Sequence, residues 1–338
     1  MKQRFSRPAA DVVHALLTGE NLQPDEAMQL AREESTAGLM TAANRLRSEY
    51  HDNTFYTCGI INAKCGGCSE DCCFCGQSRH TQGNGGEGYD FIDIEEAHRT
   101  AAALDLAGIA RLSLVASGRS ASAQTMSRLN ALYHSLREKY GFRLCGSLGL
   151  LGSKALQQLR RMGVERYHCN LEASPSYFPT ICSSHTLADK HRTLHKAREQ
   201  GLDLCSGGII GLGESMPQRI ELAQELRRLA ISSVPINIMT PLPATPLAQQ
   251  PILSLEEVLR SIAMFRLMLP RAILRMAGGR QQLGASQYLC FQAGANGAIV
   301  GNYLTTTGNP LAEDLAAIRS LGYQLETRAG ENTGGTRR

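Results

Sequence analysis

Residues 54–75 read TFYTCGIINAKCGGCSEDCCFC, and this stretch joins a strand pattern to a dense run of cysteines. Its first half, 54–61, is rich in β-branched and aromatic residues, as strands are. Further short β-prone runs follow and alternate with helical segments. These runs are residues 110–116, 142–148, 164–171, 202–209, 233–239, 272–277 and 297–301. Eight strands alternating with helices predict an α/β fold, a (β/α)8 TIM barrel, with the cysteines directly after its first strand.

The segments between the strands carry apolar residues at helical spacing. They include residues 93–108, 122–141, 186–201, 215–230 and 254–269. An open doubly wound sheet is the alternative, but no G-x-G-x-x-G motif follows the first strand, which removes the commonest reason to choose it. We expect an N-terminal helical extension over 1–50, the barrel over 51–325 and a flexible polar tail over 326–338.

The composition is that of an ordinary soluble globular protein, with 43% hydrophobic residues, 20% charged residues and a net charge of +4. This small charge, without a dense Lys/Arg tract, gives no reason to expect a nucleic-acid partner. The N-terminus lacks the apolar core of a secretory signal, and no run approaches eighteen apolar residues, so we expect a cytoplasmic protein with no membrane segment. In that reducing compartment, clustered cysteines are more often metal ligands than disulfides.

Three of the clustered cysteines, Cys68, Cys72 and Cys75, have the spacing C-x3-C-x2-C. A structural zinc site usually takes four ligands, often as two C-x2-C pairs, and the second pair is missing here. Three thiolates in one loop suit three corners of an iron–sulfur cube, whose fourth iron stays open to a small molecule. Cys65 and Cys73 interleave with this motif, and we interpret both as spare thiols.

This motif after the first strand of a barrel resembles that of the radical S-adenosylmethionine enzymes. In that family a [4Fe–4S] cluster binds S-adenosylmethionine, and one electron cleaves it to a 5′-deoxyadenosyl radical. Phe74 matches the aromatic residue that the family places beside the adenine. Several stretches, in order, narrow the resemblance to the biotin synthase family. They are INAKCGGCSEDCCFCGQS (61–78), YHCNLEASP (167–175), CSGGIIGLGE (205–214), SVPINIM (233–239), RMAGGR (275–280) and AGANGAIVGNYLTTTGNP (293–310).

The resemblance implies an enzyme that inserts sulfur into dethiobiotin to form biotin, with sulfur from an auxiliary iron–sulfur cluster deep in the barrel. It also implies a flavodoxin or ferredoxin electron donor, iron–sulfur assembly machinery and a homodimer. The alternative is another radical barrel enzyme, of the hydrogenase-maturation or methylornithine-synthase type, which we expect to lack the combination of Cys145, Cys205 and Arg275. A noncatalytic metal-binding scaffold would not need the glycine-rich segment 205–214.

The resemblance also implies ligand contacts outside the cysteine motif. For S-adenosylmethionine they are Phe74, Asn170, Glu172, Arg198, Gly207, Gly208, Gly211 and Glu214. Glycines let a backbone approach a ligand closely, and a guanidinium suits the methionine carboxylate. Asn170 and Glu172 would hold the ribose hydroxyls, although the family usually has Asp at the second position. His168, at a position that is usually Asn, and Asn237 would contact dethiobiotin, and the alternative for Asn237 is a turn residue at a strand end.

The family's usual auxiliary ligands are cysteines on strands two, three and five and an arginine near strand seven. Cys145, Cys205 and Arg275 match, but Ser113 stands on strand two, and serine is a harder ligand than a thiolate. Strand alternation directs Ser113, Cys145 and Cys205 into the barrel because the leucines between them belong toward the helices. The same alternation turns Cys169 toward a helix.

Cys58, on strand one, neighbours the position that Ser113 occupies. Some members of the family resemble this chain in that pairing, which implies an auxiliary cluster larger than [2Fe–2S]. Our hypothesis is therefore an auxiliary cluster, [2Fe–2S] or larger, held by Cys58, Cys145, Cys205 and Arg275. Cys182, in the loop 179–186, is a candidate fourth cysteine ligand, and the alternative is an unligated loop thiol. Cys290 lies in an apolar helical segment and is expected in the core.

Overall fold

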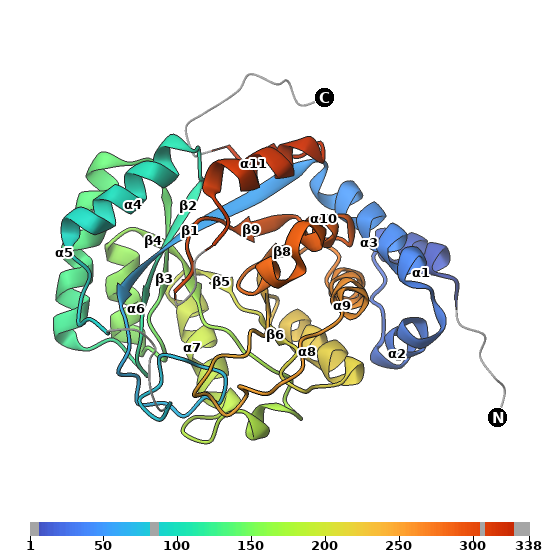
Figure 1. Cartoon of the computed structure of the whole chain (residues 1–338), viewed down its shortest axis with the longest axis horizontal. Helices are drawn as coiled ribbons and strands as arrows, with labels where there is room; N and C mark the ends of the chain where they lie inside the picture. Colours follow the sequence, from blue (N-terminus) through green and yellow to red (C-terminus); the bar gives the residue numbers. More distant parts are fainter. Residues whose placement is uncertain (1–6, 82–87, 305–307, 328–338) are drawn as a thin grey trace.

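The computed structural model describes residues 7–81, 88–304 and 308–327, with a parallel barrel at its centre (Figure 1). Within these residues the barrel strands are β1 (Thr54–Lys64), β2 (Arg111–Ala116), β3 (Arg143–Ser147), β4 (Val164–His168), β5 (Asp203–Cys205), β6 (Gly208–Ile210), β7 (Ser233–Ile238), β8 (Ile273–Met276) and β9 (Gly297–Ile299). Neighbours pair in parallel, and β9 pairs with β1 to close the ring. The predicted (β/α)8 barrel is confirmed.

The fifth strand of the barrel differs from its prediction over 202–209, because it forms two short pieces. Both β5 and β6 pair with β7, and Ser206 and Gly207 separate them. A Cβ on Gly207 would lie 1.9 Å from the carbonyl oxygen of Pro235, so the two backbones touch here. The predicted strand over 164–171 also ends early, at His168. The residues after His168 hydrogen-bond instead to the segment between β5 and β6, where the backbone N–H of Leu171 donates to the Gly207 carbonyl.

An outer ring of helices surrounds the strands (Figure 1). It contains α4 (Ile94–Leu106), α5 (Ala123–Lys139), α6 (Ser153–Arg161), α7 (Leu187–Glu199), α8 (Met216–Arg228) and α9 (Leu255–Met268). Side chains at the starts of four of them accept hydrogen bonds from first-turn N–H groups, as N-cap residues do: Asp93, Ser122, Thr186 and Ser254. Short polar residues therefore fix where each of these helices begins.

The N-terminal helices lie beside the barrel, next to α9 and α10 (Leu289–Gln292) (Figure 1). They are α1 (Ala9–Leu17), α2 (Pro24–Glu33) and α3 (Thr36–His51). Buried Leu39 and Leu46 of α3 belong to the same hydrophobic core as Phe55 of β1 and Phe291 of α10. The described part of the helical extension predicted over 1–50 therefore packs into the same core as the barrel. The division of the chain into an extension and a barrel stays a prediction.

The chain ends beside its first strand. After β9 come α11 (Leu311–Ser320) and β10 (Gln324–Leu325), and β10 pairs in parallel with the start of β1. The loop helices η1 (Phe178–Thr180) and η2 (Arg280–Tyr288) complete the described elements. Most of the tail predicted over 326–338 lies outside the described residues, which end at residue 327.

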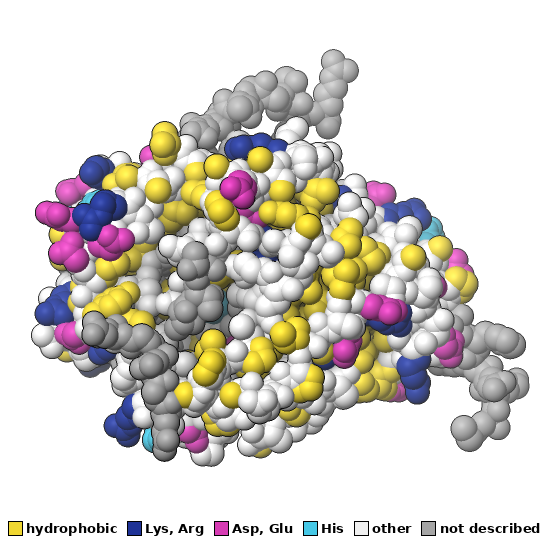
Figure 2. All heavy atoms as spheres, viewed as in Figure 1, with side chains coloured by type: hydrophobic (Ala, Val, Ile, Leu, Met, Phe, Trp, Pro, Cys, Tyr) yellow, Lys and Arg dark blue, Asp and Glu magenta, His cyan; other side chains and the backbone are white. Residues whose placement is uncertain are grey.

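Two surface properties bear on the expected partners. In the part of the chain that is described, no helix has both the length and the apolar character needed to cross a membrane. Figure 2 shows acidic and basic side chains interspersed around the rim of the visible face, without a broad patch of one sign.

Candidate active site

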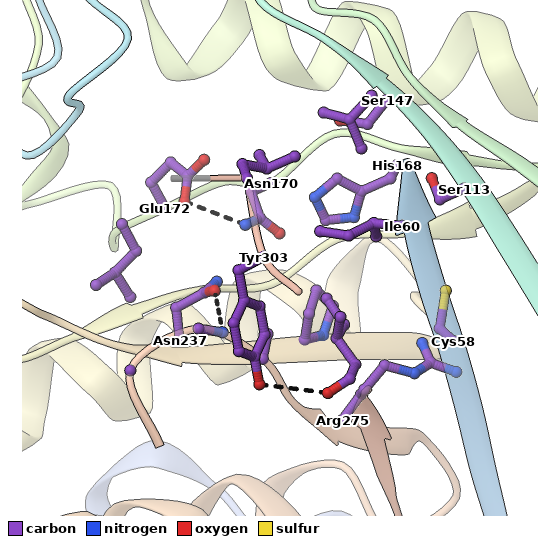
Figure 3. A pocket seen from close by; sticks show the side chains of 18 of the residues that line it. Cys58, Ile60, Ser113, Ser147, His168, Asn170, Glu172, Asn237, Arg275 and Tyr303 are labelled. Atoms are coloured by element: carbon purple, nitrogen blue, oxygen red, sulfur yellow. Dashed lines mark hydrogen bonds between the residues drawn. The ribbon is translucent and has the colours of Figure 1, made fainter. Parts of the chain in front are cut away.

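The barrel encloses a cavity of about 380 Å³ whose walls carry many of the residues singled out in the sequence. Figure 3 shows Glu172 and Asn170 toward one end of this pocket and Cys58, Ser113 and Arg275 toward the other. The predicted residues that line it are Cys58, Phe74, Cys75, Ser113, Cys145, His168, Asn170, Glu172, Cys205, Asn237 and Arg275. Residues more than 200 positions apart thus share one enclosed space.

The deep end of the pocket holds three buried thiols. Cys58, Cys145 and Cys205 are 8%, 4% and 7% exposed, and all three line the cavity. Ser113 lines it too and pairs with Cys145 in the register of β2 and β3, while its neighbours Leu112 and Leu114 are fully buried in the core. Strand alternation therefore predicted the direction of these side chains correctly.

Three arginines line the same end: Arg111, Arg166 and Arg275. Arg275 donates one hydrogen bond, from Nη1 to Ser233 Oγ at 2.7 Å, but within the described residues its Nε and Nη2 have no hydrogen-bond partner. The same holds for Nη1 of Arg111 and for Nε and Nη1 of Arg166. Buried donors without acceptors are costly, so this end suits an anionic, acceptor-rich group. Thiols among guanidinium groups fit an iron–sulfur cluster with its sulfides.

Burial affects the three thiols unequally. It raises the pKa of Cys58 to about 12 and also raises the pKa of Cys145. Burial pushes Cys205 in the same direction, but His168 and nearby arginines outweigh it and bring the pKa of Cys205 to about 6. The cause is a direct contact, because His168 Nδ1 lies 3.3 Å from Cys205 Sγ. Of the three thiols, Cys205 is thus the one whose surroundings favour the thiolate.

His168 and Asn237, predicted to contact dethiobiotin, both face the pocket but have protein partners. His168 contacts Cys205, as described above. Asn237 Oδ1 accepts a hydrogen bond from the Gly278 N–H at 3.0 Å, and its Nδ2 donates to the Gly208 carbonyl at 3.3 Å. An amide has two donors and two acceptor sites, so Asn237 keeps capacity for a ligand while it ties two strand ends together.

Near the opening of the pocket, Asn170 and Glu172 form one hydrogen-bonded unit. Asn170 Nδ2 donates to Glu172 Oε2 at 3.2 Å, and its Oδ1 accepts from the Gly207 N–H at 2.9 Å. Glu172 has a φ of 71°, which turns the chain away from the strand direction. Phe74 and Cys75 reach the same cavity from the loop after β1. An aromatic ring, an amide and a carboxylate thus meet beside the cysteine motif.

The loop that carries Cys68, Cys72 and Cys75 is held by its own backbone. Cys68 N–H donates to the Gln77 carbonyl at 3.0 Å, Arg79 N–H donates to the Cys68 carbonyl at 2.8 Å, and Cys75 N–H donates to the Cys72 carbonyl at 3.1 Å. All eleven cysteines of the chain lie within the described residues, and each is a free thiol. Three partly buried thiols in a folded loop above the barrel are a suitable ligand set for an iron–sulfur cube.

The structure does not bring Arg198, which was predicted to contact S-adenosylmethionine, to the pocket. It lies at the end of α7, where its guanidinium donates to the carbonyls of Leu229 and Ala230 just after α8. These carbonyls are orphan acceptors at a helix C-terminus, which attract a cation. Arg198 thus joins the ends of two outer helices, and it is absent from the described residues that line the cavity.

The glycines of the segment 205–214 pack against neighbouring parts of the chain, whereas Cys205 and Ile209 of the same segment line the cavity. A Cβ on Gly208 would lie 2.5 Å from the Glu172 carbonyl oxygen, and Gly211 has a φ of 94°. Glu214 Oε1 accepts from the Gly211 N–H at 2.8 Å and from Arg219 Nε at 2.6 Å. Among the described lining residues, Gly207, Gly208, Gly211 and Glu214 do not occur. In this structure, the backbone at these glycines lies close to neighbouring strands and turns of the protein.

Lys190 is a buried cation that the sequence analysis missed. It is 7% exposed and lies on the buried face of α7, with its Nζ 5.8 Å from the centre of the Phe178 ring. Burial alone would lower its pKa, but the attraction of Cys169, Glu172 and Cys72 outweighs burial, so the pKa of Lys190 is raised. A lysine on the apolar stripe of a helix was the signal that could have found it.

The remaining cysteines divide into core and loop. Cys169 and Cys290 belong to the main hydrophobic core, as predicted. Cys182 was a candidate fourth ligand of the auxiliary cluster, and this is wrong: its Sγ lies 3.7 Å from Cys72 Sγ, in the loop above the barrel. Cys73 packs beside Cys182 in a small apolar cluster, and Cys65 forms a backbone bridge with Tyr89.

Comparisons with known proteins agree with this site. Residues 64–226 match the Radical SAM superfamily, and residues 235–324 match the Biotin and Thiamin Synthesis associated domain. A biotin synthase of Desulfotalea psychrophila is 44% identical over 316 residues, covering 93% of this chain and 94% of the relative. A biotin synthase of Porphyromonas gingivalis is 43% identical over 315 residues, covering 93% and 95%.

Solved structures share the fold at lower identity. Methylornithine synthase superposes with a TM-score of 0.78 at 19% identity, covering 93% of this chain and 97% of the other. The FeFe-hydrogenase maturase from Carboxydothermus hydrogenoformans superposes with a TM-score of 0.78 at 16% identity, covering 95% and 80%. These two enzyme types were the alternatives left open by the sequence, and they share the barrel alone. By its sequence identity over nearly its whole length, the chain belongs to the biotin synthase family of radical S-adenosylmethionine enzymes.

Proposed function

We propose that the chain is a sulfurtransferase that converts dethiobiotin to biotin inside the barrel pocket. The observation that carries the proposal is the arrangement of the two thiol sets, one in the loop at the opening and one at the deep end, with the barrel cavity between them. When bound, a [4Fe–4S] cluster and S-adenosylmethionine supply radical C–H abstraction, and an auxiliary iron–sulfur cluster supplies the sulfur. The protein's part is to position the substrate and exclude water.

Residues near the opening would hold S-adenosylmethionine. Cys68, Cys72 and Cys75 would ligate the [4Fe–4S] cluster, and Phe74 would pack beside the adenine. The Asn170–Glu172 pair, already joined at 3.2 Å, presents an amide and a carboxylate to the ribose hydroxyls. Ionised carboxylates accept strong hydrogen bonds from hydroxyl groups.

For the methionine carboxylate we propose Lys190 in place of Arg198. Lys190 is buried close enough to Cys72 and Glu172 for their charges to raise its pKa, so its cation lies between the cluster loop and the ribose pair. Arg198 is engaged with carbonyls at the end of α8. A buried ammonium needs a negative partner, and a ligand carboxylate would supply one.

The deep residues would hold the auxiliary cluster. Cys58, Cys145, Cys205 and Arg275 are the proposed ligands, and those guanidinium nitrogens of Arg111 and Arg166 that lack a hydrogen-bond partner would face its sulfides. Ser113 would not supply a thiolate. The test is an iron and sulfide count with Mössbauer spectra on Cys58→Ala, with Cys65→Ala as the control. An unchanged auxiliary signal in Cys58→Ala would remove Cys58 from the ligand set.

Between the two ends, the walls would orient dethiobiotin and keep solvent out. Asn237 retains hydrogen-bonding capacity toward the cavity, and Tyr303 lies beside it in the pocket (Figure 3). Apolar side chains from several strands and loops form much of the remaining wall: Ile60, Val115, Ile209 and Ile299. Exclusion of water protects a reactive carbon radical from side reactions.

Other features of the proposal concern the enzyme's surroundings. The electron for the first cluster would come from a flavodoxin or ferredoxin, and iron–sulfur assembly machinery would load both clusters. We propose a cytoplasmic homodimer, because free clustered thiols require a reducing compartment and the family resemblance implies a dimer. Sedimentation of the anaerobic protein would test the dimer, and a monomer at micromolar concentration would contradict it.

The deciding experiment is anaerobic turnover with dethiobiotin, S-adenosylmethionine and a reductant. We expect biotin and 5′-deoxyadenosine, both absent when Cys72 is replaced by Ala. Formation of 5′-deoxyadenosine without biotin would retain the radical chemistry and overturn the substrate.

A further inference from the structure

A second group of potential metal ligands lies outside the barrel pocket, beside the cysteine motif. The Sγ atoms of Cys72 and Cys182 are 3.7 Å apart, and His185 Nδ1 and Nε2 are 3.2 Å and 3.8 Å from Cys182 Sγ. The ligand atoms of these three residues all lie within 4.8 Å of one another. Cys182 and His185 are each 7% exposed, so both are held in place by packing.

These separations match a single tetrahedral ion. Two sulfurs at about 2.3 Å from Zn²⁺ lie about 3.8 Å apart at the tetrahedral angle, and a sulfur and an imidazole nitrogen lie about 3.6 Å apart. The Cys72–Cys182 separation is close to the first value, and the two Cys182–His185 separations, 3.2 Å and 3.8 Å, lie on either side of the second. Two thiolates and one imidazole are ligands that Zn²⁺ prefers over harder cations. The fourth position is open to solvent or to Asp71 Oδ1, which lies 3.2 Å from Cys182 Sγ.

The histidine is held by a carboxylate, as metal-binding histidines often are. Its Nδ1 lies 2.6 Å from Glu70 Oε2 and 3.2 Å from Cys182 Sγ, so Nδ1–H can donate to the carboxylate, and Nε2 is the nitrogen left for an ion, which it reaches by a turn of the ring. Glu70 is in turn fixed by Arg119 Nη1 at 3.0 Å and by Ser184 Oγ at 3.0 Å. Carboxylate–histidine pairs of this kind orient the ring and increase its basicity toward a metal.

We propose that Cys72, Cys182 and His185 form a mononuclear binding site for Zn²⁺ or a similar divalent transition metal in the cluster-free protein. Binding replaces the two thiol protons, so two protons are released for each ion taken up if both thiols start protonated. Because Cys72 belongs to the C-x3-C-x2-C motif, the ion and the [4Fe–4S] cluster exclude each other. This exclusion rests on the proposed function, whereas the ion site itself rests only on the side-chain geometry.

The site makes cluster loading sensitive to competing metals. An ion held by Cys72 and Cys182 occupies a thiolate that the cluster needs, so it must leave before the cluster can form. A cell in which zinc outcompetes iron would therefore accumulate inactive chains that are fully folded. This competition by zinc depends on Cys182 and His185, because the proposed ion site needs these two ligands in addition to Cys72.

The test uses Co²⁺ as a spectroscopic substitute for Zn²⁺ in the full-length, cluster-free protein under anaerobic conditions. We expect wild-type protein to bind one Co²⁺ with thiolate-to-cobalt charge-transfer absorption and tetrahedral visible bands. Cys182→Ser and His185→Gln should each weaken binding by roughly tenfold or more. Cys68→Ser is the matched variant, because it removes a thiol of the motif but no ligand of the proposed site, and it should keep the wild-type spectrum. Cys65→Ser should also keep it.

A second measurement follows iron incorporation during reconstitution with iron and sulfide. Equimolar zinc should slow loading of the wild-type motif and have little effect on Cys182→Ser. The proposal is overturned if Cys182→Ser and His185→Gln bind Co²⁺ like wild type, or if Cys68→Ser abolishes the signal, because the metal would then sit on the motif thiols. It is also overturned if Cys182→Ser cannot hold a [4Fe–4S] cluster, since Cys182 would be a cluster ligand. None of these outcomes depends on turnover of dethiobiotin.

Discussion

Lys190 and Arg198 are two cations on the same helix with opposite surroundings. Lys190 lies on the buried face of α7 with Thr193, Leu194 and Ala197, whereas Arg198 reaches past the helix end to two carbonyls. Sequence resemblance selected the arginine because a guanidinium fits a carboxylate. Our proposal takes the lysine instead, because of the two cations Lys190 is the one whose pKa is raised by Glu172 and Cys72.

Replacement of Lys190 by Met should therefore raise the KM for S-adenosylmethionine by about ten- to a hundredfold, the range of a lost charge-assisted hydrogen bond. The kcat at saturation should fall less, because the reacting centre lies elsewhere. Arg198→Met is the control and should leave KM within about twofold. Steady-state kinetics on both variants check this, and a larger KM effect from Arg198→Met would restore the sequence-based assignment.

His51 predicts a pH dependence of stability that is independent of the clusters. Burial and the nearby charges of Arg266 and Arg47 lower the pKa of this histidine from 6.5 to about 4. The unfolded chain therefore binds a proton that the folded chain excludes, and the stabilisation is complete above pH 6.5 and lost as the pH falls toward 4. Protonation of His51 should therefore lower the free energy of unfolding between pH 7 and pH 5. The decrease should be at most about 2 kcal/mol, because solvent partly screens this half-exposed side chain.

Urea denaturation of the cluster-free protein at these two pH values would measure this effect. His51→Gln should have a smaller pH dependence than wild type, while the carboxylates contribute equally to both. Parallel pH profiles for the two proteins would show that folding does not lower the pKa of His51.

At the scale of elements, the break between β5 and β6 depends on a missing side chain. A Cβ on Gly207 would meet the Pro235 carbonyl oxygen at 1.9 Å, and backbone atoms cannot move away as a flexible side chain can. Gly207→Ala should lower the free energy of unfolding by about 1–3 kcal/mol through overpacking. Gly141→Ala has no atom within 4 Å of its Cβ and should change stability by less than about 0.5 kcal/mol. Equal denaturation midpoints for the two variants would contradict the close approach.

The elements also show where sequence reasoning sufficed. Strand alternation is a local property, so it placed Ser113, Cys145 and Cys205 in the barrel without knowledge of the rest of the fold. The contacts of Arg198 depend on which side of α7 packs against α8, and no pattern within α7 reveals this. Cys182 was misplaced because its loop folds over Cys72, 110 residues earlier in the chain. Local periodicity predicts direction within an element, and long-range packing decides which elements meet.

At the scale of the whole molecule, one buried ion pair attaches the last helix to the barrel. Arg280, at the start of η2, pairs with Asp314 of α11, and the two side chains are 1% and 0% exposed. Arg280 Nε also reaches Tyr303 OH at 3.2 Å, on the pocket wall. The network thus connects the C-terminal end of the chain to the proposed substrate site.

Asp314→Asn should lower the free energy of unfolding by about 3–5 kcal/mol, because it leaves the Arg280 charge buried without its partner. Glu96→Gln removes an exposed partner of Arg99 and should cost less than about 1 kcal/mol. Thermal denaturation of both variants would check the difference. A similar Tm for the two would mean that solvent reaches Arg280.

The closure of the ring has a consequence for biosynthesis. β1 is flanked by β2 and, through Tyr56, Thr57 and Cys58, by β9 near the other end of the chain. A ribosome must therefore add about 220 residues after Cys75 before the first strand finds its second neighbour. At roughly 5–20 residues per second, this takes on the order of 10–45 s. Throughout that interval the thiols of the motif have emerged but the barrel beneath them is incomplete, so the first metal that they meet can arrive before the enzyme has a pocket.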